Sequence, residues 1–258
     1  MAGTEALLRA CAAAGCVRRV VCASTSGVVG IFGEAERHAL ASDEAPETPY
    51  AEAAAAGWPY YRTKIEAEKL ARRLALELRL EVACVRPSLL LGPGDWRLAS
   101  CRSVLDLIEG KVPFVPPGGI SFVDARDAAA ATLRAARAPF PAGELSRTFL
   151  LAAHNCSLEE YFEAVCAEAG VRPPWLKVPT PAAWAAASAA NAGLGLLGRY
   201  DPSLDPVLVE MAVAHWGADA KRARHELGFA PRPPQETLRD TVAWLRENSE
   251  ELTRRHGE

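Results

Sequence analysis

The sequence predicts an α/β fold in which helices cover a parallel sheet. Short apolar runs bounded by turn residues alternate with helix-forming stretches, and the connections between them are short. This alternation is typical of strand–helix–strand crossovers in a parallel sheet. Two of the apolar runs end in hydroxyl-bearing residues, and ligands bind at the carboxyl ends of the strands in such sheets. With 258 residues, half of them hydrophobic, the chain can bury a core as one large domain or two intertwined ones.

The first expected elements are a helix and a buried strand. The helix should cover residues 4–14, with Thr4 as its N-cap and Gly15 as its end. The apolar run Val20–Ala23 has the length of a buried strand in a parallel sheet. It leads into a cluster of hydroxyl side chains at residues 24–26, followed by Gly27.

A second helix and strand follow a polar stretch. Residues 33–58 are expected to form a long loop. The next helix carries Tyr60 and extends to about Leu78, because good helix formers dominate it. The strand after it covers residues 81–86 and should end at Pro87, which has no backbone N–H. Leu89–Leu91 then leads into a turn over residues 92–95.

The rest of the chain adds helices and one strand. A helix should begin near Asp127, which we predict to be its N-cap. A strand is expected over residues 148–152 and a helix over residues 157–169. The final third is predicted to be helical with Pro-rich joints, ending in one amphipathic helix over residues 235–255.

Composition limits the partners and the compartment. The formal charge of −3 and the pI near 6.0 give no cationic field, so nucleic acid is not an expected partner. The seven cysteines form no C-x-x-C pair and have no nearby His in metal-site spacing, which predicts reduced, buried thiols and no metal site. The N-terminus shows no secretory signal. We therefore expect a cytoplasmic protein.

One segment tests that expectation. Residues 181–198 are uncharged and rich in Ala, but they are fewer and less apolar than a bilayer span requires. A packed or interfacial helix is expected there, which leaves membrane association through this segment as the weaker alternative. No spanning segment is predicted.

Tyr60 and Lys64 form the clearest chemical motif. Residues four apart on a helix project from one face, one turn from each other. A nearby ammonium group favours the phenolate and lowers the pKa of a Tyr from about 10. Such a Tyr can exchange a proton with a substrate oxygen near neutral pH. The pair alone is weak evidence, but the hydroxyl cluster after one strand and Ser88 after the next are expected at the same sheet edge.

Five segments in order resemble one enzyme family. They are RRVVCASTSGVVG, YYRTK, VRPSLLLGPGD, FVDARDAAAATL and KRARHELGFAPRPPQETLRDTVAWLRE. Together they resemble the extended short-chain dehydrogenases/reductases, most closely the dihydroflavonol-reductase and 3β-hydroxysteroid-dehydrogenase branch. The resemblance implies a Rossmann-type doubly wound parallel sheet with an intertwined, mostly helical substrate domain. Residues 1–92 would be part of the dinucleotide-binding domain, and residues 93–258 mainly the substrate-binding region.

The resemblance also implies roles for individual residues. Tyr60 would be the catalytic acid/base, and Lys64 would hold the ribose of the cofactor and lower the pKa of Tyr60. Thr25 falls where the family has a Ser or Thr that binds the substrate oxygen, and Ser24 takes that role if the register differs by one residue. Tyr61 is expected to pack or to line the substrate pocket instead.

NAD or NADP is the implied cofactor, and the sequence does not show which. Pro87 and Ser88 would contact its nicotinamide end. Family members begin with a strand and a Gly-x-x-Gly-x-x-Gly turn that binds the pyrophosphate, whereas this sequence begins with a predicted helix. The expected explanation is a truncated gene model or a fragment. The strand at Val20–Ala23 would then be an exposed apolar sheet edge.

Several neighbouring residues are expected to be structural. Trp184 and Trp216 should be core residues, and none of the five His residues is assigned to catalysis. Asp124 and Arg126 either line the site or form a structural ion pair.

These features predict an NAD(P)-dependent oxidoreductase that interconverts an alcohol and a ketone on a small-molecule substrate, dihydroflavonol-like or 3β-hydroxysteroid-like. One alternative is a nucleotide-sugar epimerase or dehydratase, which the resemblance implies would use the same Tyr and Lys. The other is a non-catalytic remnant that acts as a binding module. The sequence does not decide whether the chain forms a homodimer.

Overall fold

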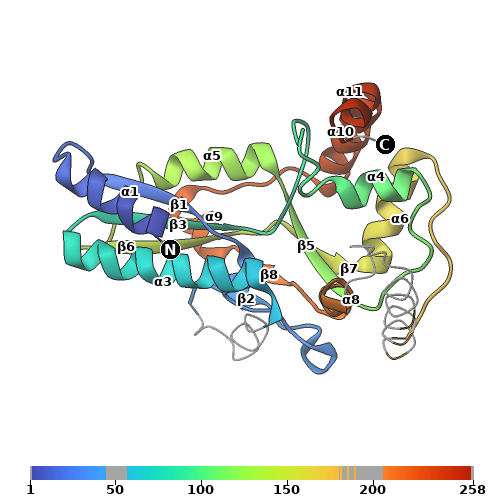
Figure 1. The fold of residues 1–258 in the computed structure, drawn as a ribbon, viewed down its shortest axis with the longest axis horizontal. Coiled ribbons are helices and arrows are strands. Elements are labelled where there is room, and N and C mark those ends of the chain that lie inside the picture. The colour runs from blue at the N-terminus through green and yellow to red at the C-terminus, as the bar shows by residue number, and fades with distance from the viewer. Residues whose placement is uncertain are drawn as a thin grey trace.

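The computed structural model describes residues 2–44, 57–179 and 206–256, together with residues 181, 185 and 189. A three-stranded parallel sheet lies at its centre (Figure 1), with the strands in the order β1 (Arg19–Ala23), β3 (Glu81–Pro87) and β6 (Ser146–Leu151). Val21 lies opposite Ala83, and Val85 opposite Phe149. The predicted α/β fold with a parallel sheet is therefore confirmed.

Helices cover both faces of this sheet. In Figure 1, α1 (Ala2–Ala13) and α3 (Pro59–Leu78) lie on one side, and α5 (Ala125–Ala135) lies on the other. Alternate residues of β3 point to the two sides. Val82 and Cys84 pack with α1 and α3, whereas Ala83 and Val85 pack with α5 and α9 (Lys221–Leu227). The strand is apolar along its length because both of its faces are buried.

A second body of structure surrounds a mixed sheet. Here β4 (Leu89–Leu91) runs parallel to β5 (Gly119–Asp124), and β7 (His154–Ser157) pairs antiparallel with β5. Helices α4 (Arg102–Ile108), α6 (Leu158–Ala169) and α10 (Pro234–Glu247) share one apolar core with it. The remaining elements are listed here: η1 (Ser26–Val28), η2 (Glu34–Glu36), β2 (Ala41–Ser42), α8 (Pro206–Val213), β8 (Ala218–Asp219) and α11 (Ser249–His256).

Two predicted N-caps are wrong. Helix α1 already includes Ala2, so Thr4 lies inside it, although Gly15 ends this segment with a φ of 66° as expected. Helix α5 is capped by Asp124, whose side chain accepts a hydrogen bond from the Arg126 N–H. Asp127 lies in the first turn and binds Arg232 instead. Asp124, three residues before the predicted cap, caps the helix in its place. Asp127 pairs with the guanidinium of Arg232.

Three other boundaries also differ. The polar stretch contains η2 and β2, which pairs with β8, while residues 45–56 lie outside the described part. Strand β3 continues through Pro87, which lies opposite Leu151. The single C-terminal helix is two helices, α10 and α11, with Asn248 between them. The Asn248 side chain donates to the Trp244 carbonyl and satisfies a backbone acceptor where α10 ends.

The spacing Gly27-x-x-Gly30-x-x-Gly33 does occur after β1, but it does not form a dinucleotide-binding turn. It is followed by the short η2 and not by a long helix. Gly27 is needed for packing, because a Cβ there would lie 2.4 Å from the Tyr61 ring and 3.1 Å from the Trp216 ring. Gly27 therefore lets the chain after β1 pass closely under the aromatic side chains of Tyr61 and Trp216.

The seven thiols are free. Cys84, Cys101 and Cys166 are buried, whereas Cys16 is exposed, contrary to expectation. Among the helices that the structure describes, none has the length and hydropathy to cross a membrane. Apart from three isolated positions, the segment 181–198, including Trp184, lies outside the described residues.

Candidate active site

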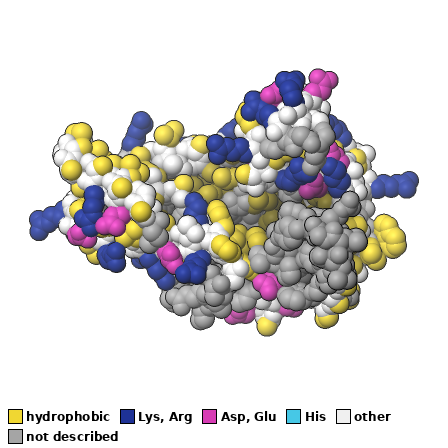
Figure 2. Space-filling model, viewed as in Figure 1, with side chains coloured by type: hydrophobic (Ala, Val, Ile, Leu, Met, Phe, Trp, Pro, Cys, Tyr) yellow, Lys and Arg dark blue, Asp and Glu magenta, His cyan; other side chains and the backbone are white. Residues whose placement is uncertain are grey.

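A cavity of about 820 Å³ lies where the carboxyl ends of β1 and β3 meet the first turn of α3. Segments around β4, β5, α4 and α6 complete its walls. In the space-filling view, hydrophobic side chains gather in the hollow at the centre of the molecule, while Lys and Arg side chains lie on its outer surface (Figure 2). The cavity thus joins the sheet edge that the sequence points to with the second body of structure.

Tyr60 and Lys64 both line this cavity. Helix α3 begins at Pro59, a residue that suits the first helical position because its missing N–H needs no partner there. The Lys64 Nζ lies 5.8 Å from the centre of the Tyr60 ring and donates a hydrogen bond to the Ala23 carbonyl at 3.1 Å. Lys64 therefore ties the first turns of α3 to the end of β1.

The pKa of Tyr60 shifts in the direction opposite to the prediction. Tyr60 exposes 57% of its surface, yet partial burial raises the pKa of its phenol above the ordinary value of 10. The ammonium group of Lys64 lies over the ring and donates to a carbonyl, so it does not offset this effect in the protein alone. The Tyr60 phenol is accordingly protonated at neutral pH.

Three hydroxyl side chains end β1 beside Tyr60. Ser24 and Ser26 are buried, Thr25 is half-buried, and all three line the cavity. The Ser24 hydroxyl has no hydrogen-bond partner among the described residues. Thr25 precedes η1 and makes no side-chain cap, so its hydroxyl is not committed to that turn. Both residues offered by the sequence as alternatives therefore reach the cavity.

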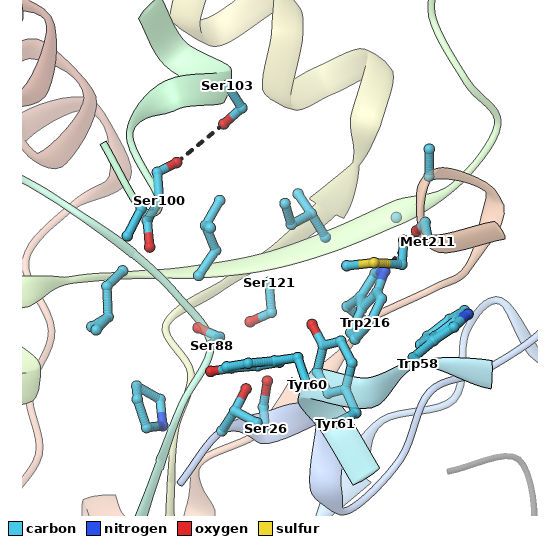
Figure 3. A pocket seen from close by; sticks show the side chains of 18 of the residues that line it. Ser26, Trp58, Tyr60, Tyr61, Ser88, Ser100, Ser103, Ser121, Met211 and Trp216 are labelled. Carbon is cyan, nitrogen blue, oxygen red and sulfur yellow. Dashed lines mark hydrogen bonds between the residues drawn. The ribbon is translucent and has the colours of Figure 1, made fainter. Parts of the chain in front are cut away.

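The end of β3 supplies the next part of the wall. Pro87 and Ser88 both line the cavity, and the buried Ser88 hydroxyl makes a long hydrogen bond of 3.4 Å to the Leu151 carbonyl. In Figure 3, Ser26 and Ser88 lie beside the ring of Tyr60. The structure thus brings together Ser24, Thr25, Tyr60, Lys64, Pro87 and Ser88, the six residues predicted from the sequence.

A buried ion-pair network holds α3 against β3 behind the site. Arg86, one residue before Pro87, donates to Glu68, which lies one turn after Lys64 on α3. Arg86 also donates to Asp43 at 3.1 Å, and the Asp43 carboxylate accepts from the Leu150 N–H. The Arg86, Glu68 and Asp43 side chains are each at most 4% exposed. This network fixes the positions of the two elements that carry Tyr60, Lys64 and Ser88.

Aromatic side chains form another wall. Tyr61 packs between Trp58 and Trp216, with ring centres 5.8 and 5.2 Å away, and it lines the cavity as well. Burial strongly raises the pKa of the Tyr61 phenol, so this residue is not suited to exchange protons near neutral pH. Trp216, expected to be a core residue only, also lines the cavity, next to Met211 (Figure 3).

Sequence reasoning missed part of the cavity wall. Ser100 lies in the loop before α4 and Ser103 in α4. Tyr161 comes from α6 and Ser121 from β5. Ser121 had a detectable signal, because it is a polar residue inside the apolar strand Ile120–Val123. The other three carry no local signal, since only the packing of α4 and α6 against the mixed sheet brings them to the cavity.

Charge is scarce in this cavity. Among the described residues that line it, Lys64 is the one charged side chain. Asp124 and Arg126 are not among them; they form an ion pair of 2.7 Å, and Asp124 is also 3.5 Å from Arg232. Of the two alternatives for Asp124 and Arg126, the structure shows the ion pair and not a place in the cavity wall. The cavity combines apolar and aromatic walls with neutral hydroxyls and one cation.

Comparison with known proteins places this arrangement in context. The chain is 28% identical over 257 residues to sterol demethylase protein B of Methylococcus capsulatus, covering 95% of this chain and 71% of that protein. It is 27% identical to the 3beta-hydroxysteroid-dehydrogenase/decarboxylase isoform 1 of Arabidopsis thaliana, covering 93% and 56% of the two chains. A dihydroflavonol 4-reductase of Zea mays is 35% identical over 116 residues, which are 43% of this chain and 32% of that protein.

Solved structures share the fold. The crystal structure of gox2253 matches with a TM-score of 0.76 and 25% identity, covering 95% of this chain and 71% of that chain. MoeE5 in complex with UDP-glucuronic acid and NAD matches with a TM-score of 0.66 and 23% identity, covering 95% and 70%. At that identity the second match shows the fold alone.

A family model decides the assignment. The model described as the NAD dependent epimerase/dehydratase family matches residues 1–146. This is more than half of the 258 residues and includes Ser24, Tyr60, Lys64 and Ser88. The resemblance to extended short-chain dehydrogenases/reductases is thereby confirmed, and the chain belongs to the NAD dependent epimerase/dehydratase family.

Proposed function

We propose that this protein interconverts an alcohol and a ketone on an apolar, ring-containing substrate, with NAD or NADP as the hydride carrier. The observation that carries the proposal is the composition of the cavity wall. Tyr60, Lys64 and a cluster of hydroxyls meet at one edge of a cavity whose other walls are apolar and aromatic. The sterol- and flavonol-related names of the similar proteins support a substrate of this kind.

Tyr60 is the proposed proton shuttle. Its phenol is protonated at neutral pH, since its pKa lies above the ordinary value of 10, and this is the state needed to donate a proton to a ketone oxygen. In the reverse direction the Tyr60 phenolate takes the proton from the alcohol and becomes the phenol. Thr25 or Ser24 positions the substrate oxygen; both residues line the cavity, and the Thr25 hydroxyl makes no cap hydrogen bond that would compete for this role.

The residues present fit one end of the cofactor. Lys64, Pro87 and Ser88 stand at the carboxyl ends of parallel strands, where ligands bind in such sheets, and they would hold the ribose and nicotinamide. The buried Ser24 hydroxyl without a partner is consistent with a bound group in this position. The cofactor would supply or accept the hydride. Within the described residues, no glycine-rich turn leads from a strand into a long helix to bind a pyrophosphate.

A nucleotide-sugar substrate is less compatible with the cavity. A sugar diphosphate carries negative charge that a binding site normally pairs with Arg, Lys or a helix N-terminus. Lys64 is the one cation among the described lining residues, and the proposed role of Lys64 is to hold the cofactor. The apolar alcohol or ketone is therefore the better supported substrate class.

The test is NAD(P)H-dependent reduction of a flavanone or a steroid ketone by the 258-residue chain. Tyr60→Phe should lower the rate about 100-fold or more, the usual contribution of a positioned acid/base. The affinity for NAD(P)H, measured by nicotinamide fluorescence, should stay within about threefold because the ring remains. A matched control is Tyr61→Phe, which should keep the rate within about tenfold because Tyr61 has no proton-transfer role.

Three outcomes separate the hypotheses. Turnover retained in the Tyr60→Phe variant would refute the proton-shuttle role. Tight NAD(P)H binding would exclude the binding-module alternative that lacks a cofactor. No detectable NAD(P)H binding would refute catalysis by this chain on its own.

A further inference from the structure

Two thiols face each other across neighbouring strands of the central sheet. Cys22 of β1 lies directly opposite Cys84 of β3 in the parallel register. Both side chains pack on the side of the sheet that α1 and α3 cover. The Cys84 thiol donates a hydrogen bond to the Cys22 sulfur. The two sulfur atoms are therefore neighbours while both cysteines are reduced.

The backbone geometry of this pair suits a disulfide bond. Adjacent strands lie about 4.8 Å apart, so the Cα atoms of directly opposite residues have a similar separation. Disulfides join residues whose Cα atoms are roughly 4.4–6.8 Å apart and whose Cβ atoms point the same way. Cys22 and Cys84 meet both conditions, since they are register partners on one side of the sheet. The structure describes all seven cysteines, and this is the one pair that a strand register places opposite each other.

The two thiols differ in access and in acidity. Cys22 is half-buried on β1, which pairs with β3 only among the described strands, whereas Cys84 is 0% exposed. The hydrogen bond from Cys84 lowers the pKa of the Cys22 thiol below its ordinary value, despite burial and the nearby Glu68 carboxylate. The same hydrogen bond, together with burial, raises the pKa of the Cys84 thiol. Because the thiolate is the reactive form of cysteine, a small oxidant reacts with Cys22 first.

We propose that Cys22 and Cys84 form a reversible disulfide when the protein meets a hydroperoxide, with Cys22 attacked first and Cys84 completing the bond. The Cys22 thiolate attacks one oxygen of the hydroperoxide and the O–O bond breaks, which leaves a sulfenic acid on Cys22. The other oxygen leaves as water or an alcohol, after taking up the proton that Cys22 had released. The Cys84 sulfur then attacks the Cys22 sulfur, and the hydroxide that leaves takes the Cys84 proton and departs as water. The two thiols lose two electrons in total, and these reduce the hydroperoxide.

This inference goes beyond the proposed function and does not depend on it. The bond would join the two strands that lead to the cavity, since Ser24 follows Cys22 on one strand and Ser88 follows Cys84 on the other. It would also close a long loop that contains the whole of α3. Closing a long loop restricts the unfolded chain, so the disulfide should raise the melting temperature by about 4 °C or more.

Mapping the bond in the wild-type chain tests the inference directly. Reduced protein is treated with equimolar hydrogen peroxide, its remaining thiols are alkylated, and it is digested without reductant. Mass spectrometry should find the peptide of Cys22 linked to the peptide of Cys84 within single chains, and dithiothreitol should remove the link. The matched control is Cys16→Ser, which removes an exposed thiol and should leave the link intact.

Variants test the order of the two steps. In Cys84→Ala the sulfenic acid on Cys22 has no thiol to complete the bond, so dimedone, which captures sulfenic acids, should label Cys22 about tenfold more than in the wild type. In Cys22→Ala the buried Cys84 should stay reduced under the same treatment. The mapping in the wild type decides the inference even where either variant fails to fold.

Each result has a definite consequence. The mapped link, its loss with dithiothreitol and a raised melting temperature of the oxidised wild type would support the inference. Absence of the Cys22–Cys84 link, or a link from Cys22 to Cys11 or Cys16 in its place, would overturn it. A lowered melting temperature after oxidation would show that the strands must move to form the bond, contrary to the geometry argued above. Equal dimedone labelling of Cys22 in the wild type and in Cys84→Ala would refute the role of Cys84.

Discussion

At the scale of single residues, Tyr60 shows that spacing determines neighbours but not the pKa. The spacing of four correctly predicted that Tyr60 and Lys64 share a face of one helix. It also predicted a lowered phenol pKa, and the structure shows a raised one. The cause of the raised pKa is partial burial of the phenol, while Lys64 donates to the Ala23 carbonyl, a residue 41 positions away in sequence. No local pattern could reveal that partner.

The pH dependence of Tyr60 can be measured directly. Since burial raises its pKa above the ordinary value of 10, Tyr60 in the free protein should release its proton only above pH 10, and its capacity to donate a proton should be lost as the pH rises through this raised pKa. The measurement is the ultraviolet absorbance of tyrosinate during a pH titration of the wild type minus that of Tyr60→Phe. A difference step below pH 10 would contradict this prediction.

At the scale of elements, the buried ion-pair network links α3 to β3. Arg86→Met should lower the free energy of unfolding by about 3–5 kcal/mol, because it leaves the buried Glu68 and Asp43 without their cation. Urea denaturation monitored by circular dichroism gives this value. The matched control is Arg62→Ala on the same helix, whose exposed pair with Glu66 should contribute less than about 1 kcal/mol. Similar losses in the two variants would refute the structural importance of the network.

The elements also show where sequence patterns suffice. The end of α3 at Leu78 was predicted well because helix-forming residues run to that point, and Arg79 then adopts a left-handed conformation. The cap of α5 was assigned to the wrong Asp, because a strand leads directly into the helix and two acidic residues lie three apart. Choosing between them depends on Arg232, which binds Asp127 from far along the chain.

At the scale of the whole molecule, β1 is an edge of the central sheet. Within the part of the chain that the structure describes, β1 pairs with β3 only. The Ser24 N–H donates to the Val85 carbonyl, and the Glu81 N–H donates to the Arg18 carbonyl. The backbone N–H and C=O groups of the even-numbered residues of this strand therefore face β3. The polar backbone groups of Arg19 and Val21 face outward. Such an edge can pair with another chain.

A proline substitution tests this edge. Val21→Pro removes an outward N–H and should reduce concentration-dependent association, measured by sedimentation velocity, with the fold retained. Cys22→Pro is the control, because it removes an N–H that faces β3 and should instead lower the melting temperature. Wild-type protein that stays monomeric at all concentrations tested would show that the edge does not drive association.

The sequence alone determined the parallel α/β sheet, the family and six residues that the structure brings to one cavity at the edge of that sheet. These depend on local information: apolar runs of strand length, hydroxyls that follow them, and a Tyr and Lys one helical turn apart. Only the tertiary structure decided the hydrogen bond from Lys64 to Ala23, the ion pairs of Arg86, and the arrival of Ser103 and Tyr161 at the cavity. Each of these joins residues that are distant in the chain, so the packing of whole elements determines them.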